Sequence, residues 1–151
     1  MRAVVQRVNS AVVRVGGQEI SAIGPGLLVF LGVGQADDAA DVDYMVKKIC
    51  GLRIFRDAHG RMGHALAQCG GGVMVVPQFT LYGDVGKGNR PSFLGAADPV
   101  KGRCLYEKVL AGIHEQGLPV CGGCFQEHME VELINQGPVT ILLDSQKKSD
   151  F

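Results

Sequence analysis

The sequence has no excess of charge of either sign. Its 15 basic and 15 acidic side chains give a formal net charge of zero when histidine is neutral. Proteins that coat long stretches of duplex bind by neutralising many phosphates, and a chain without net positive charge lacks the field for this. The balance argues against that class of DNA-binding protein. It leaves room for a protein that contacts only the end of an RNA.

A long apolar run is also missing. The longest such stretch, residues 26–33, is far shorter than the roughly 20 residues that a helix needs to span a bilayer. The first ten residues carry Arg2, Gln6 and Arg7 among their apolar side chains and lack the continuous apolar core of a leader segment. We therefore expect no membrane contact and a cytoplasmic protein.

Cysteine is present in an odd number, with five residues in the chain of 151. A secreted disulfide scaffold more often has an even number in a shorter chain, so a reducing compartment is the simpler interpretation. Cys121 and Cys124 form a Cys-x-x-Cys pair, which is half of a zinc site or a redox pair. His128, His114 or Cys104 could supply further ligands, but they form no second pair of the usual spacing. We expect an incidental pair, with no metal and no cofactor.

Hydrophobic patterning predicts strands along much of the chain, with no linker and no internal repeat. Strands are expected over residues 1–15 (as two short stretches), 18–23, 27–33, 53–55, 73–76, 128–134 and 139–143. Residues 83–99 are expected to form a long surface loop. This order of elements predicts an α+β protein with largely antiparallel or mixed sheets in a barrel-like core beside two main helices. We expect a single domain over residues 1–145 and a polar tail over 146–151.

The two helices are predicted from changes of period and from capping residues. The first is expected over 37–50, where apolar residues recur at helical spacing, with Asp37 or Asp38 as its N-cap. The second is expected to begin at Asp98-Pro99, an N-cap followed by proline at the first helical position, and to end at Gly117.

The segment Pro77-Gln78-Phe79-Thr80-Leu81 follows directly after a predicted buried strand. Strand alternation would place Gln78 and Thr80 on one side, with Phe79 and Leu81 on the other. The threonine hydroxyl is a candidate nucleophile, but such a group needs a neighbouring base. No Ser-His-Asp spacing is present, and the four histidines are interpreted as ordinary surface or turn residues.

The segment Asn135-Gln136-Gly137-Pro138-Val139-Thr140 is the second unusual one, and it lies between two predicted strands. A Gly-Pro pair in such a place is either a plain turn or a turn with a cis proline. Composition alone leaves both interpretations open, and neither segment by itself names a reaction.

Together, the two segments resemble the two signature motifs of the D-aminoacyl-tRNA deacylase family. The matching residues are Gln78-Phe79-Thr80-Leu81 and Asn135-x-Gly137-Pro138-Val139-Thr140. Further segments match the family in order and spacing: Arg7 with Ala11-Val12-Val13-Arg14-Val15, Ile23-Gly24-x-Gly26-Leu27-Leu28, Gly32-Val33, Arg53-Ile54-Phe55 and Arg90-Pro91-Ser92-Phe93. The resemblance covers nearly the entire chain, to about Leu143. It is specific because both motifs and this framework agree.

The resemblance implies a homodimer with active sites at the subunit interface, which hydrolyses the ester of D-aminoacyl-tRNA and of glycyl-tRNA as a form of proofreading. The Gly137-Pro138 peptide is expected to be cis and to reach into the partner's site, where it crowds the alpha carbon of the amino acid. A rigid backbone clash of this kind rejects an L side chain without tight side-chain recognition. Arg7 is expected to brace this turn, although without the resemblance it would be interpreted as a solvent-facing strand arginine.

Residue roles also follow from the resemblance. The 2′-hydroxyl of the terminal adenosine of tRNA is expected to activate the attacking water, while backbone N–H groups hold the carbonyl oxygen. The expected catalytic set is Gln78, Phe79 and Thr80. The expected substrate-binding residues are Arg7, Pro77, Leu81, Phe125, Asn135, Gly137, Pro138, Val139 and Thr140.

Contact with RNA needs a local basic surface, because the overall charge provides none. Lys87 and Arg90 lie in the glycine-rich loop just after the first motif and could meet phosphates near the acceptor end. An ordinary solvated loop is the other interpretation. Phe125 could stack on the terminal adenine, or it could belong to the core.

Position 77 departs from the family pattern, in which the first motif usually begins with serine. Pro77 has neither a hydroxyl nor a backbone donor, so any hydrogen bond made by that serine is lost. Pro77-Gln78 resembles the start of this motif in a sibling branch that edits mischarged L-alanyl-tRNA. Phe79 and residues 137–140 instead resemble the D-specific branch. The alternatives are a sibling-type deacylase, a non-catalytic module that binds tRNA ends, and a metal-binding module built on the cysteine pair.

Overall fold

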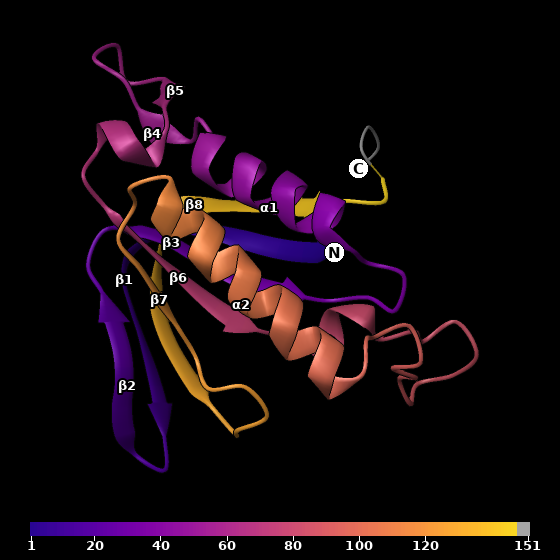
Figure 1. The fold of residues 1–151 in the computed structure, drawn as a ribbon. Coiled ribbons are helices and arrows are strands. Elements are labelled where there is room, and N and C mark those ends of the chain that lie inside the picture. Colours follow the sequence, from indigo (N-terminus) through magenta and orange to yellow (C-terminus); the bar gives the residue numbers. More distant parts are fainter. Residues whose placement is uncertain (148–151) are drawn as a thin grey trace.

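β1 (Arg2–Val15) is the strand to which most of the sheet is attached in this computed structural model, which describes residues 1–147 (Figure 1). Its first half pairs with β3 (Gly26–Gly32) along one edge, and its second half pairs with β2 (Gln18–Ile23). β8 (Glu130–Asp144) follows β1 along nearly its whole length. All three pairings are antiparallel.

The first fifteen residues were expected to form two short strands, and this expectation was wrong. One strand of 14 residues runs through the segment. Its pairing with β8 shifts register between Gln6 and Val8 and again between Val8 and Ser10. The irregular stretch is therefore absorbed by bulges in the ladder rather than by a break in the strand.

Beyond β3 the sheet continues in parallel with β6 (Gly72–Pro77) and β7 (Val120–Gly122). The apolar runs of β3 and β6 are almost wholly buried, as predicted for central strands. Gly26 allows these two strands to approach, because a Cβ at this position would lie 2.0 Å from the carbonyl oxygen of Gly72. β7 was not predicted, since three residues are too few to show a period.

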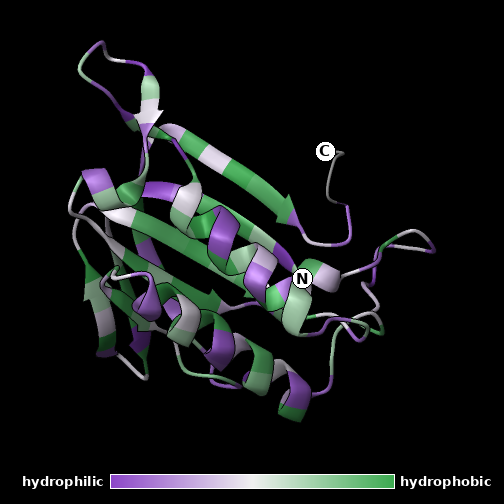
Figure 2. Ribbon diagram, turned by 45° about the horizontal axis from the view of Figure 1, so that its top comes forward, coloured by the Kyte–Doolittle hydropathy of each residue, from purple (hydrophilic) through white to green (hydrophobic). Residues whose placement is uncertain are grey.

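Apolar side chains cover both faces of the sheet. On one face, α1 (Ala39–Gly51) and α2 (Pro99–Glu115) pack over β1, β3 and β6 and form the larger core. On the other face, Met129, Val131 and Leu133 meet a smaller core from the same strands. Figure 2 shows the apolar residues concentrated on the central strands. This is the predicted α+β architecture, with a barrel-like sheet and two main helices.

Both helices begin where the sequence predicts. The Asp38 side chain caps α1 and forms a capping box with Asp41. The Asp98 side chain caps α2 just before Pro99. In the part of the chain that the structure describes, no helix is long and apolar enough to cross a membrane.

Asp37, the other candidate cap, is buried and has a different role. Its carboxylate accepts hydrogen bonds from the Met1 ammonium and from the Gly34 N–H, both at 2.6 Å. It also accepts a hydrogen bond from the Tyr82 hydroxyl at 3.3 Å. Burial and the nearby Asp37 carboxylate raise the pKa of Tyr82, so the phenol stays protonated and donates. Asp37 therefore links Met1, Gly34 and Tyr82, of which Met1 and Tyr82 lie far from it in the sequence.

Smaller elements complete the chain. They are β4 (Phe55–Arg56), β5 (Met62–His64) and two 3₁₀ helices, η1 (Leu66–Gln68) and η2 (Phe79–Tyr82). The strand predicted over 53–55 thus forms at its far end only. The first residue of the polar tail predicted over 146–151 is hydrogen-bonded to the rest of the chain, because the Gln146 amide donates to Asp37 and Asp41. The tail's remaining part, 148–151, lies outside the described residues.

Tyr106 ties α2 to the sheet. Its hydroxyl donates to the carbonyl of Val75 at 2.7 Å and accepts from the N–H of Gly123 at 3.2 Å. Burial raises the pKa of Tyr106 to about 12, so the phenol is neutral at ordinary pH.

We expect Tyr106→Phe to lower the free energy of unfolding by about 1–3 kcal/mol, because both hydrogen bonds of the hydroxyl are lost. The Gly123 N–H keeps its second hydrogen bond, to the Val75 carbonyl at 3.1 Å. Urea unfolding measures this change.

The raised pKa of Tyr106 also means that the stability of the wild type falls as pH rises from about 10, the unfolded value, towards the folded value. The Tyr106→Phe variant lacks this contribution. Tyr44→Phe is the matched control, since the Tyr44 ring also packs against the core but its hydroxyl makes no hydrogen bond with residues 1–147. Equal stability of the two variants would contradict the expectation.

Candidate active site

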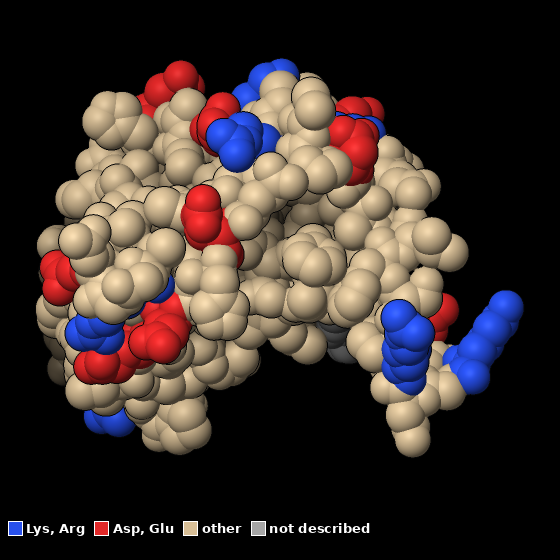
Figure 3. Space-filling view, turned by 90° about the horizontal axis from the view of Figure 1, so that it is seen from below, with Lys and Arg blue, Asp and Glu red and all other residues tan. Residues whose placement is uncertain are grey.

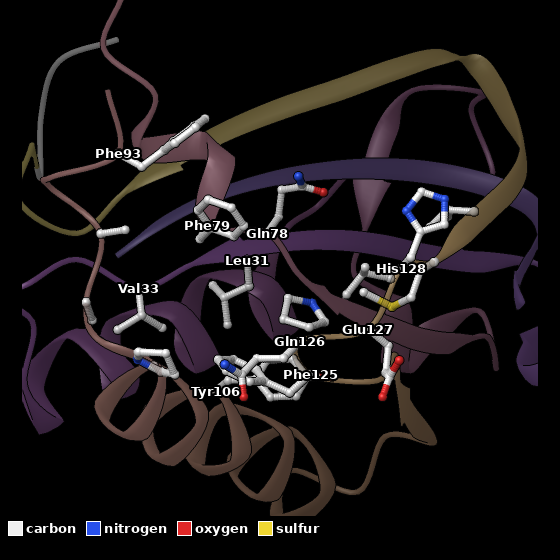
Figure 4. A pocket seen from close by; sticks show the side chains of 18 residues that line it. Leu31, Val33, Gln78, Phe79, Phe93, Tyr106, Phe125, Gln126, Glu127 and His128 are labelled. Atoms are coloured by element: carbon white, nitrogen blue, oxygen red, sulfur yellow. The ribbon is translucent and has the colours of Figure 1, made fainter. Parts of the chain in front are cut away.

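A cavity of about 600 Å³ lies at the carboxyl ends of β3 and β6 (Figure 4). η2 and the start of α2 form two of its sides, and residues 125–131 close it. The lining is mainly apolar and aromatic with a few polar groups, which is typical of sites for small organic groups. Figure 3 shows this face of the molecule hollowed and mostly free of charged side chains in the hollow.

The first motif leaves the sheet at the edge of this cavity. The Gln78 N–H donates to the carbonyl of Leu31 at 2.8 Å, and the next residues coil into η2. The expected strand alternation over 78–81 was therefore wrong. Gln78 and Thr80 nevertheless meet, because the coil lets the Gln78 amide donate to the Thr80 hydroxyl.

Two aromatic pairs face each other across the cavity (Figure 4). Phe79 is 58% exposed and packs edge-to-face on Phe93, with ring centroids 5.0 Å apart. Phe125 and Tyr106 form the opposite pair, with centroids 6.1 Å apart. The guanidinium of Arg103 lies 5.2 Å from the centroid of the Phe125 ring.

The cavity brings together some of the predicted site residues and adds others. Pro77, Gln78, Phe79 and Phe125 line it, whereas Thr80 and Leu81 belong to η2 and do not. Residues that the sequence did not single out for the site also line it: Leu31, Phe93, Tyr106, Gln126, His128 and Met129. Their types and spacing were those of strand, helix or loop residues, so only their meeting in space identifies them.

The second motif does not line this cavity. Gln6 pairs with Thr140 and Val8 pairs with Asn135, so the intervening residues 136–139 project from β8 opposite Arg7. The two strands predicted on either side of the motif are thus one strand with a projecting loop. The Gly137-Pro138 peptide within this loop is cis, as the resemblance implied.

Polar side chains hold the base of the projecting loop. The Asn135 amide donates to the Thr140 hydroxyl at 3.0 Å, and its oxygen accepts from the Val139 N–H at 2.9 Å. Gln6 donates to the same hydroxyl at 3.2 Å. Gly137 lies at the exposed tip with a φ of +127°. The loop is therefore presented outward on a fixed base.

Arg7 is buried beneath this loop, with 4% of its surface exposed. Its Nε donates to the carbonyl of Gln136 at 3.2 Å, and its Nη1 donates to the carbonyl of Ile54 at 2.6 Å. The bracing contact that the resemblance implied is present. The solvent-facing arginine that the residues alone suggested is not.

Neither cysteine of the Cys121–Cys124 pair lines the cavity, and neither do Lys87 and Arg90 of the glycine-rich loop. Cys121, on β7, is half-buried, and burial raises the pKa of its thiol. Within residues 1–147, no three His, Cys, Asp or Glu side chains gather as metal ligands do. Lys87 and Arg90 are exposed on the loop that projects beside the hollowed face in Figure 3.

Known proteins resemble the chain over almost its full length. A family profile described as D-Tyr-tRNA(Tyr) deacylase matches residues 4–144. A D-aminoacyl-tRNA deacylase of Symbiobacterium thermophilum is 52% identical over 97% of both chains. Those of Syntrophobacter fumaroxidans (53% identical; 97% of this chain, 99% of the relative) and Myxococcus xanthus (54%; 96% and 95%) are similar.

Two solved structures share the fold. One, titled c-Myc DNA Unwinding Element Binding Protein, has a TM-score of 0.90 and 38% identity, and the match covers 95% of this chain and 98% of that one. The other, titled a probable eukaryotic D-amino acid tRNA deacylase, has a TM-score of 0.79 over 94% and 97% of the two chains. Its 18% identity shows likeness of fold alone.

We expect Arg7→Lys to lower the free energy of unfolding by about 1–3 kcal/mol, because a single ammonium cannot replace two separate guanidinium bonds and leaves a buried carbonyl unpaired. Urea unfolding measures the change. Arg14→Lys is the matched control on the same strand: Arg14 pairs with Glu132 at the surface, and such pairs contribute about 0–1 kcal/mol. A loss for Arg7→Lys no larger than for Arg14→Lys would show that the brace is unimportant.

Proposed function

Because the chain belongs to the D-aminoacyl-tRNA deacylase family, we propose that it hydrolyses the ester between a D-amino acid and the terminal adenosine of tRNA. The products are the free D-amino acid and tRNA. The observation that carries the proposal is the family match over residues 4–144, which includes both motifs and all of the residues that line the cavity. Since aminoacyl-tRNA is made and used in the cytoplasm, the protein would act there.

The cavity would receive the 3′ end of the tRNA. Its aromatic walls suit a base, and Phe125 would stack on the terminal adenine. Lys87 and Arg90 on the projecting loop would meet backbone phosphates near the acceptor end. Affinity would then come from one stacked nucleotide and a few local charges, in keeping with a net charge of zero.

Chiral selection would come from the Gly137-Pro138 loop of a second copy of the chain. Within one chain this loop does not line the cavity, yet it is exposed and held on a fixed base. β8 pairs along one edge only within residues 1–147 and exposes Ile134 and Leu142 by 57% and 51%. A homodimer formed there would place the loop against the partner's substrate, where it would exclude an L side chain and admit a D-amino acid or glycine.

Catalysis would depend on positioning more than on a side-chain nucleophile. The Thr80 hydroxyl accepts a hydrogen bond from Gln78, and this amide is no base that could activate it. The 2′-hydroxyl of the terminal adenosine would therefore activate the attacking water. Backbone N–H groups of Phe79 and Thr80, at the start of η2, would hold the carbonyl oxygen as it gains charge.

A second candidate rests on Pro77. It ends β6, lines the cavity and has no N–H to offer a substrate. Because Pro77-Gln78 resembles the same motif in the sibling branch, the second candidate function is hydrolysis of mischarged L-alanyl-tRNA.

The test is release of amino acid from D-tyrosyl-tRNA, L-tyrosyl-tRNA, glycyl-tRNA and mischarged L-alanyl-tRNA. We expect hydrolysis of the D-tyrosyl and glycyl esters, with the L-tyrosyl ester intact, because only an L side chain meets the loop. Hydrolysis of the L-alanyl ester alone would assign the sibling activity. A chain that binds tRNA ends but releases nothing would be a non-catalytic module.

We expect Gly137→Ala to reduce kcat/KM for D-tyrosyl-tRNA by at least about tenfold, equal to roughly 1.4 kcal/mol. A Cβ at this position would lie 2.9 Å from Val139 Cγ2 and 3.0 Å from Arg7 Nη2, so the loop must shift. Gly17→Ala is the matched control. Gly17 also has a positive φ, +80°, but a Cβ there meets no atom within 4 Å. If both variants keep wild-type turnover, the loop has no part in the reaction.

A further inference from the structure

Gln126 has a left-handed backbone conformation, which is unusual for a residue other than glycine. Among residues 1–147 it is the one non-glycine residue with a positive φ, at +64°. L-residues adopt this region rarely, and those that do are often found at binding and catalytic sites. Neighbouring side chains of an extended chain point to opposite sides. Phe125 and Gln126 instead both line the cavity, and the left-handed turn at Gln126 accounts for this.

The Phe125 ring beside it is fixed by α2. Its centroid lies 6.1 Å from that of Tyr106, and the Arg103 guanidinium lies 5.2 Å away. Gly102 leaves room for the ring, since a Cβ there would lie 3.2 Å from Phe125 Cζ. An aromatic surface in a set orientation therefore lies next to Gln126 (Figure 4).

The carboxamide of Gln126 is unused within the described chain. The side chain is exposed and makes no hydrogen bond with any residue of 1–147. A carboxamide carries two N–H donors and one carbonyl acceptor in a plane. A flat group that stacks on Phe125 would bring its polar edge within reach of this amide.

We propose that Gln126 recognises the 6-amino group of the terminal adenine of tRNA while Phe125 stacks on the base. The inference rests on the proposed deacylase function and deepens it. A glutamine amide pairs with an adenine edge through two parallel hydrogen bonds, accepting from the amino N–H and donating to the adjacent ring nitrogen. Gln126 is thus a specificity residue for the last nucleotide, away from the ester that is cleaved.

The experiment uses D-tyrosyl-tRNA that ends either in adenosine or in purine riboside, which lacks the 6-amino group. We expect the wild type to show about tenfold lower kcat/KM on the purine riboside substrate, the loss of one base contact. Gln126→Ala lowers kcat/KM on the adenosine substrate about tenfold and treats the two substrates alike. The loss falls in KM with kcat retained, because the contact is made equally in the ground and transition states.

Two further variants separate recognition from folding. Gln126→Gly removes the same amide and suits the positive φ, so its melting temperature rises while its kcat/KM falls as in Gln126→Ala. Gln18→Ala, at an exposed position of β2, keeps the wild-type preference for adenosine. If Gln126→Ala and Gln126→Gly also keep that preference, the inference is overturned and the deacylase function stands. A wild type that hydrolyses no D-ester overturns the proposed function and the inference with it.

Discussion

Both halves of the candidate site depend on one strand that has neighbours along both of its edges. β1 holds β3, whose carboxyl end forms part of the cavity, and it holds β8, from which the Gly137-Pro138 loop projects. Where the register between β1 and β8 shifts, the Arg7 guanidinium fills the space and donates to the carbonyls of Gln136 and Ile54. A buried charge is tolerated only when it is hydrogen-bonded. Movement of the loop would therefore cost Arg7 the hydrogen bond from its Nε to Gln136.

The separation of the two motifs within one chain shapes the proposed mechanism. The first motif coils away from the sheet into η2 beside the cavity, whereas the second projects from β8 outside the cavity. A reaction that used both would need a second copy, and the exposed apolar residues of β8 would offer it a surface. The partner's loop backbone would then discriminate between D- and L-amino acids, and its conformation would be fixed before the substrate binds.

The charge balance and the cavity are consistent with each other. A net charge of zero gives no long-range attraction to RNA. The cavity has aromatic walls, Phe79 with Phe93 on one side and Phe125 with Tyr106 on the other, and base stacking on them would supply affinity that the net charge does not. Stacking tolerates any base, so discrimination between bases needs an added hydrogen-bonding group. Such a division suits an enzyme that must recognise the common end of many tRNAs and accept varied amino acids.

Features coded within a few adjacent residues could be predicted from the sequence. The helix starts at Asp38 and Asp98 and the buried runs of β3 and β6 were among them, because caps and periodicity are local. The two motifs could also be identified, through the family's pattern. Packing alone buried Arg7, coiled the chain after Gln78 and brought Tyr106 into the cavity wall. These outcomes depend on contacts between residues far apart in sequence, which no short window of sequence contains.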